Sequence, residues 1–314
     1  MPALITHRLF GDESMLRLPK GIISTNAELA AFVLGNQGPD PFFFRVRSPR
    51  FRDAMAFGGA MHRSRMTRAF AALHDGVAHL PAADSRVGRA FALGLLGHYV
   101  LDRTAHPFVY AQQHGIMAQD PALAGAGSQV HAVIESDLDL LMLQAKRGGA
   151  TVEEYPPADE LASSARIDRT AGALTSFIAR SVYGIDLPAS AYGGAVRDMR
   201  LAYTVIEPAG SPGAVRLGLL EGASGRYSLL GALAHRVTRE APAGAANLAH
   251  RPWENPFTGE ASTEDFAQVF DRALDDYERV AELFIAGNDF AAVTGHVNYS
   301  GRVLDAREEC GEDD

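Results

Sequence analysis

The segment from Gly97 to Pro107 constrains the fold of this chain most, because it carries three metal-binding side-chain types on an apolar background. His98, Asp102 and His106 are spaced four residues apart. A step of four residues turns an α-helix by only about 40° from its starting direction, so the three side chains form one stripe. Two imidazoles and a carboxylate along one ridge suit a divalent metal such as Zn²⁺. With 11 histidines and 38 acidic residues in 314 positions, chance gives far fewer than one such pattern.

The residues around this stripe predict a buried, central helix. Ser85 is a suitable N-cap, and apolar side chains follow it at Val87, Phe91, Leu95, Val100 and Leu101. Pro107 has no amide hydrogen, so we expect it to end or kink the helix beside His106.

Similar patterns elsewhere predict an all-α chain, since no segment shows the alternation of a strand. Helices are expected at 27–34 (N-cap Asn26, stop at Gly35), from near His62 to 74, at 129–146 (cap Ser128), 160–182, 189–206, around 226–239 and at 266–284 after Ser262–Asp265. Loops are expected at 113–127, 209–225 and 249–259, where glycine, alanine or proline accumulates.

Composition limits the possible partners and location. The formal net charge of −9 argues against a general nucleic-acid binder, although a single strand held in a small site stays possible. The one cysteine, Cys310, excludes an internal disulfide. The first residues lack a basic start followed by an apolar run, and the longest apolar segments fall short of the roughly 18–20 residues of a membrane span. We therefore expect a cytoplasmic protein without a transmembrane segment.

Further metal-binding residue types occur outside the central stripe. His131 and Glu135 form a second helical pair beside apolar residues, where a carboxylate needs a metal or another cation; an exposed ion pair is the alternative. His62 follows Gly58 and Gly59, and Asp40 stands between two prolines. Taken singly, these two residues and His7 are as well explained by a packed histidine or a turn.

Next to Asp40, three aromatic residues at 42–44 precede Arg45, Arg47, Arg50 and Arg52. Core packing is the preferred interpretation of the aromatic residues over contact with a lipid or a base. A solvated charged strip is preferred for the arginines over binding of a phosphate group.

The order of these motifs resembles the zinc-dependent phospholipase C family. The motifs are Thr6-His7, Gly38–Phe43, Met61-His62, His98-Tyr99 with Asp102 and His106-Pro107, and His131 with Glu135. The resemblance covers residues 1 to about 145, and beyond them rests on residues 251–257 and the final long helix. It implies an all-α multi-helix bundle with a multinuclear zinc cluster, of the type shared with fungal single-strand nucleases.

The resemblance also implies ligands for two or three zinc ions. One ion would be held by Asp40, His62, His98 and Asp102. A second would be held by His106, His131 and Glu135, and a break at Pro107 would swing His106 toward it. A third would use His7, Asp102 as a bridge, and the terminal amino group and carbonyl, which Pro2 supplies if Met1 is removed.

The expected organisation is a single helical metallohydrolase domain over residues 1–304, with a metal-binding core at 1–146, a helical part at 147–304 and an acidic mobile tail at 305–314. The expected function is hydrolysis of a phosphate ester by a phospholipase C-like phosphodiesterase that uses a zinc-activated water, which Asp40 would also orient. The substrate would be a phospholipid or another small phosphate ester, with no stable nucleic-acid partner. The alternatives are a nuclease or nucleotidase on the same scaffold, and a non-catalytic zinc-binding helical protein.

Overall fold

The computed structural model describes residues 3–222 and 228–311, and almost all of their regular structure is helical, as predicted. The α-helices are α1 (Leu4–Ser14), α2 (Asn26–Gly35), α3 (Phe51–Arg63), α4 (Met66–Ala78), α5 (Ser85–Gln119), α6 (Gly127–Lys146), α7 (Ala165–Tyr183), α8 (Ala191–Ile206), α9 (Pro212–Gly222), α10 (Leu229–Leu233), α11 (Phe266–Ala286), α12 (Phe290–Thr294) and α13 (Ala306–Cys310). Short 3-10 helices are η1 (Met15–Arg17), η2 (Asp40–Phe44), η3 (Pro121–Leu123) and η4 (Pro157–Leu161). Strands β1 (Trp253–Glu254) and β2 (Ala261–Ser262) pair antiparallel in and beside the segment expected as a loop.

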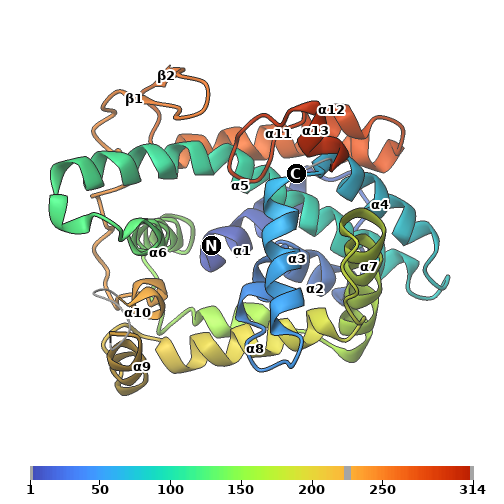
Figure 1. The fold of residues 1–314 in the computed structure, drawn as a ribbon, viewed down its shortest axis with the longest axis horizontal. Helices are drawn as coiled ribbons and strands as arrows, with labels where there is room; N and C mark the ends of the chain where they lie inside the picture. Colours follow the sequence, from blue (N-terminus) through green and yellow to red (C-terminus); the bar gives the residue numbers. More distant parts are fainter. Residues whose placement is uncertain (1–2, 223–227, 312–314) are drawn as a thin grey trace.

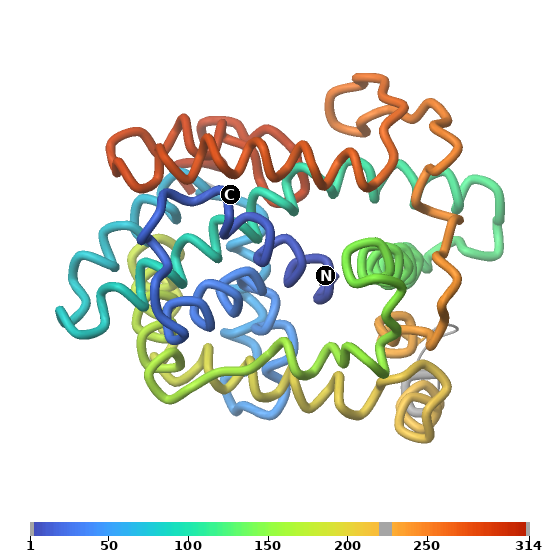
Figure 2. The backbone as a smooth tube through the Cα atoms, turned by 180° about the vertical axis from the view of Figure 1, so that it is seen from behind, coloured from blue at the N-terminus to red at the C-terminus, as the bar shows by residue number. Residues whose placement is uncertain are grey.

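Helix α5 is the centre of the architecture. Helices α2, α11 and α6 all pack against it, and Figure 1 shows α11 running along its upper side while α8 crosses the opposite edge of the molecule. Helix α1 lies near the middle in both views, between these outer helices (Figures 1 and 2). The chain therefore surrounds α1 and the middle of α5 with other helices, and His7, His98, Asp102 and His106 on these two helices are buried.

Helix α5 does not end at Pro107, as the sequence had suggested, but continues to Gln119. The first part of the predicted loop at 113–127 is therefore helical. The proline leaves the Arg103 carbonyl without its usual intrahelical donor. The backbone at Gly301 packs at this point: a Cβ there would lie 2.7 Å from the Arg103 oxygen and 2.4 Å from Pro107 Cγ. The C-terminal segment thus packs closely against the proline, and α5 continues through it.

The predicted helix starting near His62 is also wrong in its start. His62 lies in the last turn of α3, and α4 begins only at Met66. The two helices are separated by Arg65, whose φ of 62° is left-handed. An alanine- and methionine-rich stretch gives no sequence signal for such a break.

The region after α8 differs from its prediction. Residues 212–222 form α9 instead of a loop, because Ser211 accepts a hydrogen bond from the Ala214 amide and Pro212 occupies the first helical position. The helix expected around 226–239 is restricted to α10. Residues 223–227, where the predicted loop (209–225) meets the predicted helix (226–239), lie outside the described residues.

Three helix starts are one or two residues earlier than predicted: Thr25 caps α2, Asp84 precedes α5, and α6 begins at Gly127. The long helix after Ser262–Asp265 is confirmed as α11, where Asp265 and Gln268 form a capping box.

The acidic end also differs from the expected mobile tail over residues 305–311. Helix α13 is capped by Asp305, and the buried Glu309 accepts hydrogen bonds from Thr67. Residues 312–314 lie outside the described residues, and the division at residue 304 stays a prediction. Among the helices described, none combines the length and apolar character needed to cross a bilayer.

Candidate metal centre

Eight of the nine predicted metal ligands come together at the middle of α5. They are His7 on α1, Asp40 at the start of η2, His62 on α3, His98, Asp102 and His106 on α5, and His131 and Glu135 on α6. The ninth, Pro2, lies outside the described residues. In three groups each residue offers one ligand atom that lies within 4.8 Å of those of the other two: His7, Asp40 and His98; His62, His98 and Asp102; and His106, His131 and Glu135.

Asp102 is the acid that joins most of these residues. Its Oδ1 lies 3.1 Å from His7 Nε2, and its Oδ2 lies 3.4 Å from His98 Nε2. The same Oδ2 is 3.9 Å from His62 Nε2 and 3.8 Å from His106 Nδ1. A carboxylate with four imidazoles around it is placed as a bridging ligand between neighbouring ions would be.

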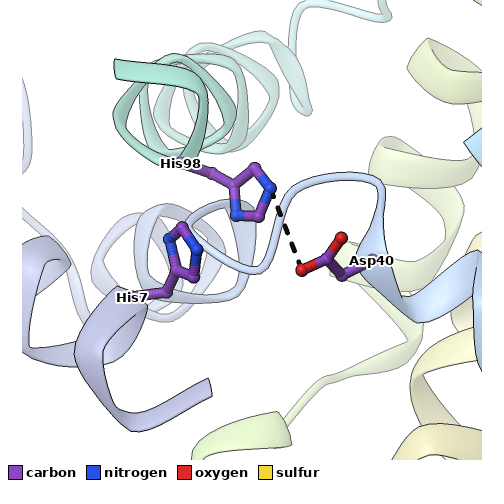
Figure 3. Close-up of side chains that lie close together, drawn as sticks. All are labelled: His7, Asp40 and His98. Carbon is purple, nitrogen blue, oxygen red and sulfur yellow. Dashed lines mark ion pairs between the residues drawn. The ribbon is translucent and has the colours of Figure 1, made fainter. Parts of the chain in front are cut away.

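Asp40 approaches the same histidines from the other side. Figure 3 shows it facing His98, with a 4.0 Å separation between Asp40 Oδ2 and His98 Nε2. The rings of His7 and His98 stack at 4.0 Å between centroids. Gly38 brings Asp40 here, since the chain passes so close to His98 that a Cβ at Gly38 would lie 2.2 Å from the ring. The positive φ of 53° at this position also favours glycine.

The second group is built between α5 and α6. Glu135 Oε1 lies 3.5 Å from His106 Nε2 and 3.3 Å from His131 Nε2. His106 reaches this group from a continuous helix, so the expected break at Pro107 is not needed. The side chain of Tyr110, one turn further along α5, places its ring 5.1 Å from that of His131.

Four of the histidines have their Nδ1 atoms fixed by an acceptor. His62 donates to the Gly58 carbonyl at 2.7 Å, His98 to the Asn36 carbonyl at 3.1 Å and His106 to the Tyr299 carbonyl at 2.7 Å. His131 donates to Gln113 Oε1 at 2.9 Å. A proton held on Nδ1 leaves the Nε2 lone pair for a metal, which is the usual arrangement around metal-binding histidines.

The buried polar atoms in the first two groups fit a bound cation. Within the described part of the chain, His98 Nε2 and His7 Nδ1 are buried and have no hydrogen-bond partner. The buried His62 Nε2 and Asp40 Oδ1 face each other as an ion pair at 3.1 Å. Buried polar atoms without partners are costly, so their convergence indicates a ligand that satisfies them together. Nitrogen and carboxylate donors in sets of three or four are the ligands that Zn²⁺ prefers.

Burial and neighbouring charges set the protonation of the site. Burial, with His7 close by, lowers the pKa of His98 to about 3, which keeps this imidazole neutral and able to bind a metal. Burial opposes ionisation of Asp102, but His106 and His98 hold the pKa of this carboxyl well below its usual value. Burial also lowers the pKa of His106, yet Asp102 and Glu135 outweigh it and raise the pKa to about 9.

The other residues considered from sequence lie outside these groups, although Phe43 packs against His62. Phe42 and Phe44 are buried as expected, and Phe43 packs its ring 5.3 Å from that of His62. Arg45 and Arg47 pair with Asp198, and Arg50 pairs with Asp186. Arg52 lies over the Phe51 ring.

Sequence reasoning missed two kinds of residue. Gln113 and the carbonyl-bearing residues that hold the imidazoles carry no motif of their own. Asp139 and His235 form a buried pair behind α6, with Nε2 and Oδ2 3.1 Å apart. The sequence does carry a signal for Asp139, because this residue continues the four-residue spacing of His131 and Glu135.

The comparison with known families agrees with this geometry. The family profile described as "Zinc dependent phospholipase C" matches residues 6–184, which is more than half of the chain and includes all eight described candidate ligands. No curated protein and no solved structure matches the chain. The protein therefore belongs to the zinc-dependent phospholipase C family.

Proposed function

We propose that this protein hydrolyses the phosphodiester bond of a phospholipid and releases diacylglycerol and a phosphorylated headgroup. In this reaction a water oxygen forms a bond to phosphorus, the bond from phosphorus to the glycerol oxygen breaks, and that oxygen takes a proton. The observation that carries the proposal is the buried convergence of imidazole and carboxylate ligand atoms in three groups, in a member of this family. Among the described residues, His98 Nε2 and His7 Nδ1 in these groups have no hydrogen-bond partner.

The chain offers positions for two or three zinc ions. His62, His98, Asp40 and Asp102 would hold one, and His106, His131 and Glu135 a second. His7, next to His98 and Asp102, would contribute to a third. Zinc bound there would supply Lewis acidity that lowers the pKa of water and neutralises charge on the phosphoryl oxygens.

Asp40 is the residue best placed to handle a proton. Burial opposes its ionisation, but His98 and His62 hold the pKa of Asp40 below its usual value, so the group is a carboxylate at neutral pH. Its buried Oδ1 lies 3.1 Å from His62 Nε2, inside the group of candidate ligands. We propose that Oδ1 orients the attacking water and accepts its proton.

The test is a substrate panel with zinc-loaded protein. Phosphatidylcholine in mixed micelles, a water-soluble phosphodiester and single-stranded DNA are supplied separately, and diacylglycerol, free alcohol and nucleotides are measured. We expect diacylglycerol release that is lost in His98→Ala and retained in His79→Ala. The control removes an exposed imidazole whose hydrogen bond goes to the Asp75 carbonyl of its own helix.

The other outcomes separate the alternatives. Nucleotide release from DNA without diacylglycerol would overturn the lipid substrate in favour of a nuclease or nucleotidase. Full zinc content without turnover of any of the phosphoesters would indicate that zinc only holds the helices together.

A further inference from the structure

A chain of three ionisable side chains lies behind the metal-binding face of α6. Asp139 and His235 are almost completely buried, at 0% and 1% exposure. His235 Nε2 lies 3.1 Å from Asp139 Oδ2, and its Nδ1 lies 2.5 Å from Glu207 Oε1. The His235 backbone amide also donates to the Glu207 carboxylate. The imidazole therefore connects two carboxylates that come from different parts of the chain.

Asp139 uses its two oxygens on the first turn of α1. The Ile5 amide donates to Oδ2 at 2.9 Å, and the Thr6 amide donates to Oδ1 at 2.7 Å. The first amides of a helix have no partner within the helix, and a carboxylate there also compensates the positive end of the helix dipole. Asp139 thus fixes the amino end of α1 to α6.

This contact lies immediately before His7. His7 follows Thr6 directly, places its Nε2 3.1 Å from Asp102 Oδ1 and stacks its ring on that of His98. Glu135 lies one turn before Asp139 on α6 and belongs to the group with His106 and His131. Helix α6 therefore carries the candidate ligand Glu135 and also Asp139, which holds the helix of the candidate ligand His7.

We propose that Asp139, held by His235 and Glu207, is a positioning residue that places His7 in the metal centre. The proposal rests on the metal-binding part of the proposed function, and not on the identity of the substrate. It assigns to Asp139 no contact with the ion, since both of its oxygens are occupied by the α1 amides and His235.

The electrostatic arrangement favours a fixed geometry over general stability. Burial lowers the pKa of His235, but Asp139 and Glu207 outweigh it and raise the pKa to about 9, so an imidazolium lies between the two carboxylates at neutral pH. The Tyr203 ring covers this imidazole at 6.3 Å between centroids. Burying Asp139 and His235 costs more free energy than an apolar contact of similar size would, so the pair contributes a specific arrangement of α1 and α6 more than it contributes stability.

The segment that carries His235 is itself docked on α6. Ser136 Oγ donates to the Ala234 carbonyl at 3.3 Å, and Gln144 Nε2 donates to the Thr238 carbonyl at 2.8 Å. The His235 carbonyl accepts from the Ala209 amide at 2.8 Å. His235 is therefore held from both its side chain and its backbone.

The experiment measures metal binding by Asp139→Asn, with Asp137→Asn as the matched control on the same helix. Asp137 pairs with the exposed Arg236 and not with α1. Zinc content after equilibration with buffered zinc, and the visible absorption of the cobalt-substituted protein, are compared with those of His7→Ala. We expect Asp139→Asn to lower the affinity for the ion that depends on His7 by at least about tenfold, as the loss of a residue that orients a ligand does elsewhere. The affinity for the other ions should stay unchanged.

A double variant distinguishes positioning from general destabilisation. Because His7 and Asp139 would act on the same ion, the variant with both changes should bind metal no more weakly than His7→Ala alone. Two results would overturn the proposal: an equal loss of affinity for every ion in Asp139→Asn, or an unchanged affinity for the ion that depends on His7. If Asp139→Asn does not fold, the affinity for the ion that depends on His7 is measured in His235→Gln instead. An unchanged affinity in that variant would also overturn the proposal.

The outcome separates this inference from the proposed function. A wild-type protein that binds zinc but hydrolyses no phospholipid would overturn the lipid substrate and leave the positioning role supported by the metal data. A His7→Ala variant with full zinc content would overturn the role of His7, and with it the positioning role of Asp139.

Discussion

His106 and Glu135 face each other across α5 and α6, with 3.5 Å between Nε2 and Oε1, although His106 shares its helical stripe with His98 and Asp102. One ridge of α5 therefore serves two neighbouring groups of candidate ligands. His98 belongs to the group with His62, His106 belongs to the group with His131, and Asp102 lies between them. The stripe that first suggested a single metal site therefore contributes residues to two neighbouring groups.

The bridging place of Asp102 leads to a prediction about metal content. We expect two or three zinc ions per wild-type chain and the loss of at least one in Asp102→Ala, because this carboxylate lies within 3.9 Å of four imidazoles. Elemental analysis after dialysis measures the count. Since removing a buried carboxylate can also unfold the protein, circular dichroism of both proteins is recorded alongside. An unchanged zinc count in the folded variant would contradict the site.

Zinc binding to the second group should release protons. Asp102 and Glu135 raise the pKa of His106 to about 9, so in the metal-free protein this imidazole is charged at pH 7. Zinc requires its neutral form, and binding therefore displaces a proton. Affinity should rise with pH up to about 9, where His106 loses its proton without help. Titration calorimetry at pH 7 in buffers of different ionisation enthalpy measures the release, and heats independent of the buffer would contradict it.

Gln113 should tune the zinc affinity of the second group without touching the ion. Its Oε1 accepts the Nδ1 proton of His131 at 2.9 Å and thereby directs the Nε2 lone pair toward Glu135. Loss of such a partner typically weakens metal binding by about 10–100-fold. We expect this for Gln113→Ala, while Gln112→Ala, the neighbouring change on α5, leaves affinity unchanged. Competition with a chromophoric chelator measures both, and equal affinities would show that Gln113 is dispensable.

The sequence predicted what depends on local spacing. Four-residue steps on α5 and α6 placed five candidate ligands on helix faces that the structure does bring together. The features that the sequence did not predict depend on contacts between distant parts of the chain. Pro107 lies within α5 where the distant segment at Gly301 packs on it, and His235 meets Asp139 from 96 residues away. No local pattern around either residue carries that information.

Gly38 offers the most direct test of how the backbone positions the site. Alanine there meets two penalties: a positive φ of 53°, and a Cβ only 2.2 Å from the ring of His98. Gly21 is the matched control, because its φ of 86° is also positive but no atom lies within 4 Å of the added Cβ. The backbone penalty, roughly 1–2 kcal/mol, should lower the free energy of unfolding in both variants. The collision should add about 1–3 kcal/mol in Gly38→Ala alone. The collision in Gly38→Ala should also weaken zinc binding to the group that contains His98, since His98 or the segment that carries Asp40 must shift. Urea unfolding of the metal-free proteins and zinc titration of the folded ones separate the two effects. Equal zinc affinities in Gly38→Ala and Gly21→Ala would mean that close packing of this turn on His98 does not shape the metal centre.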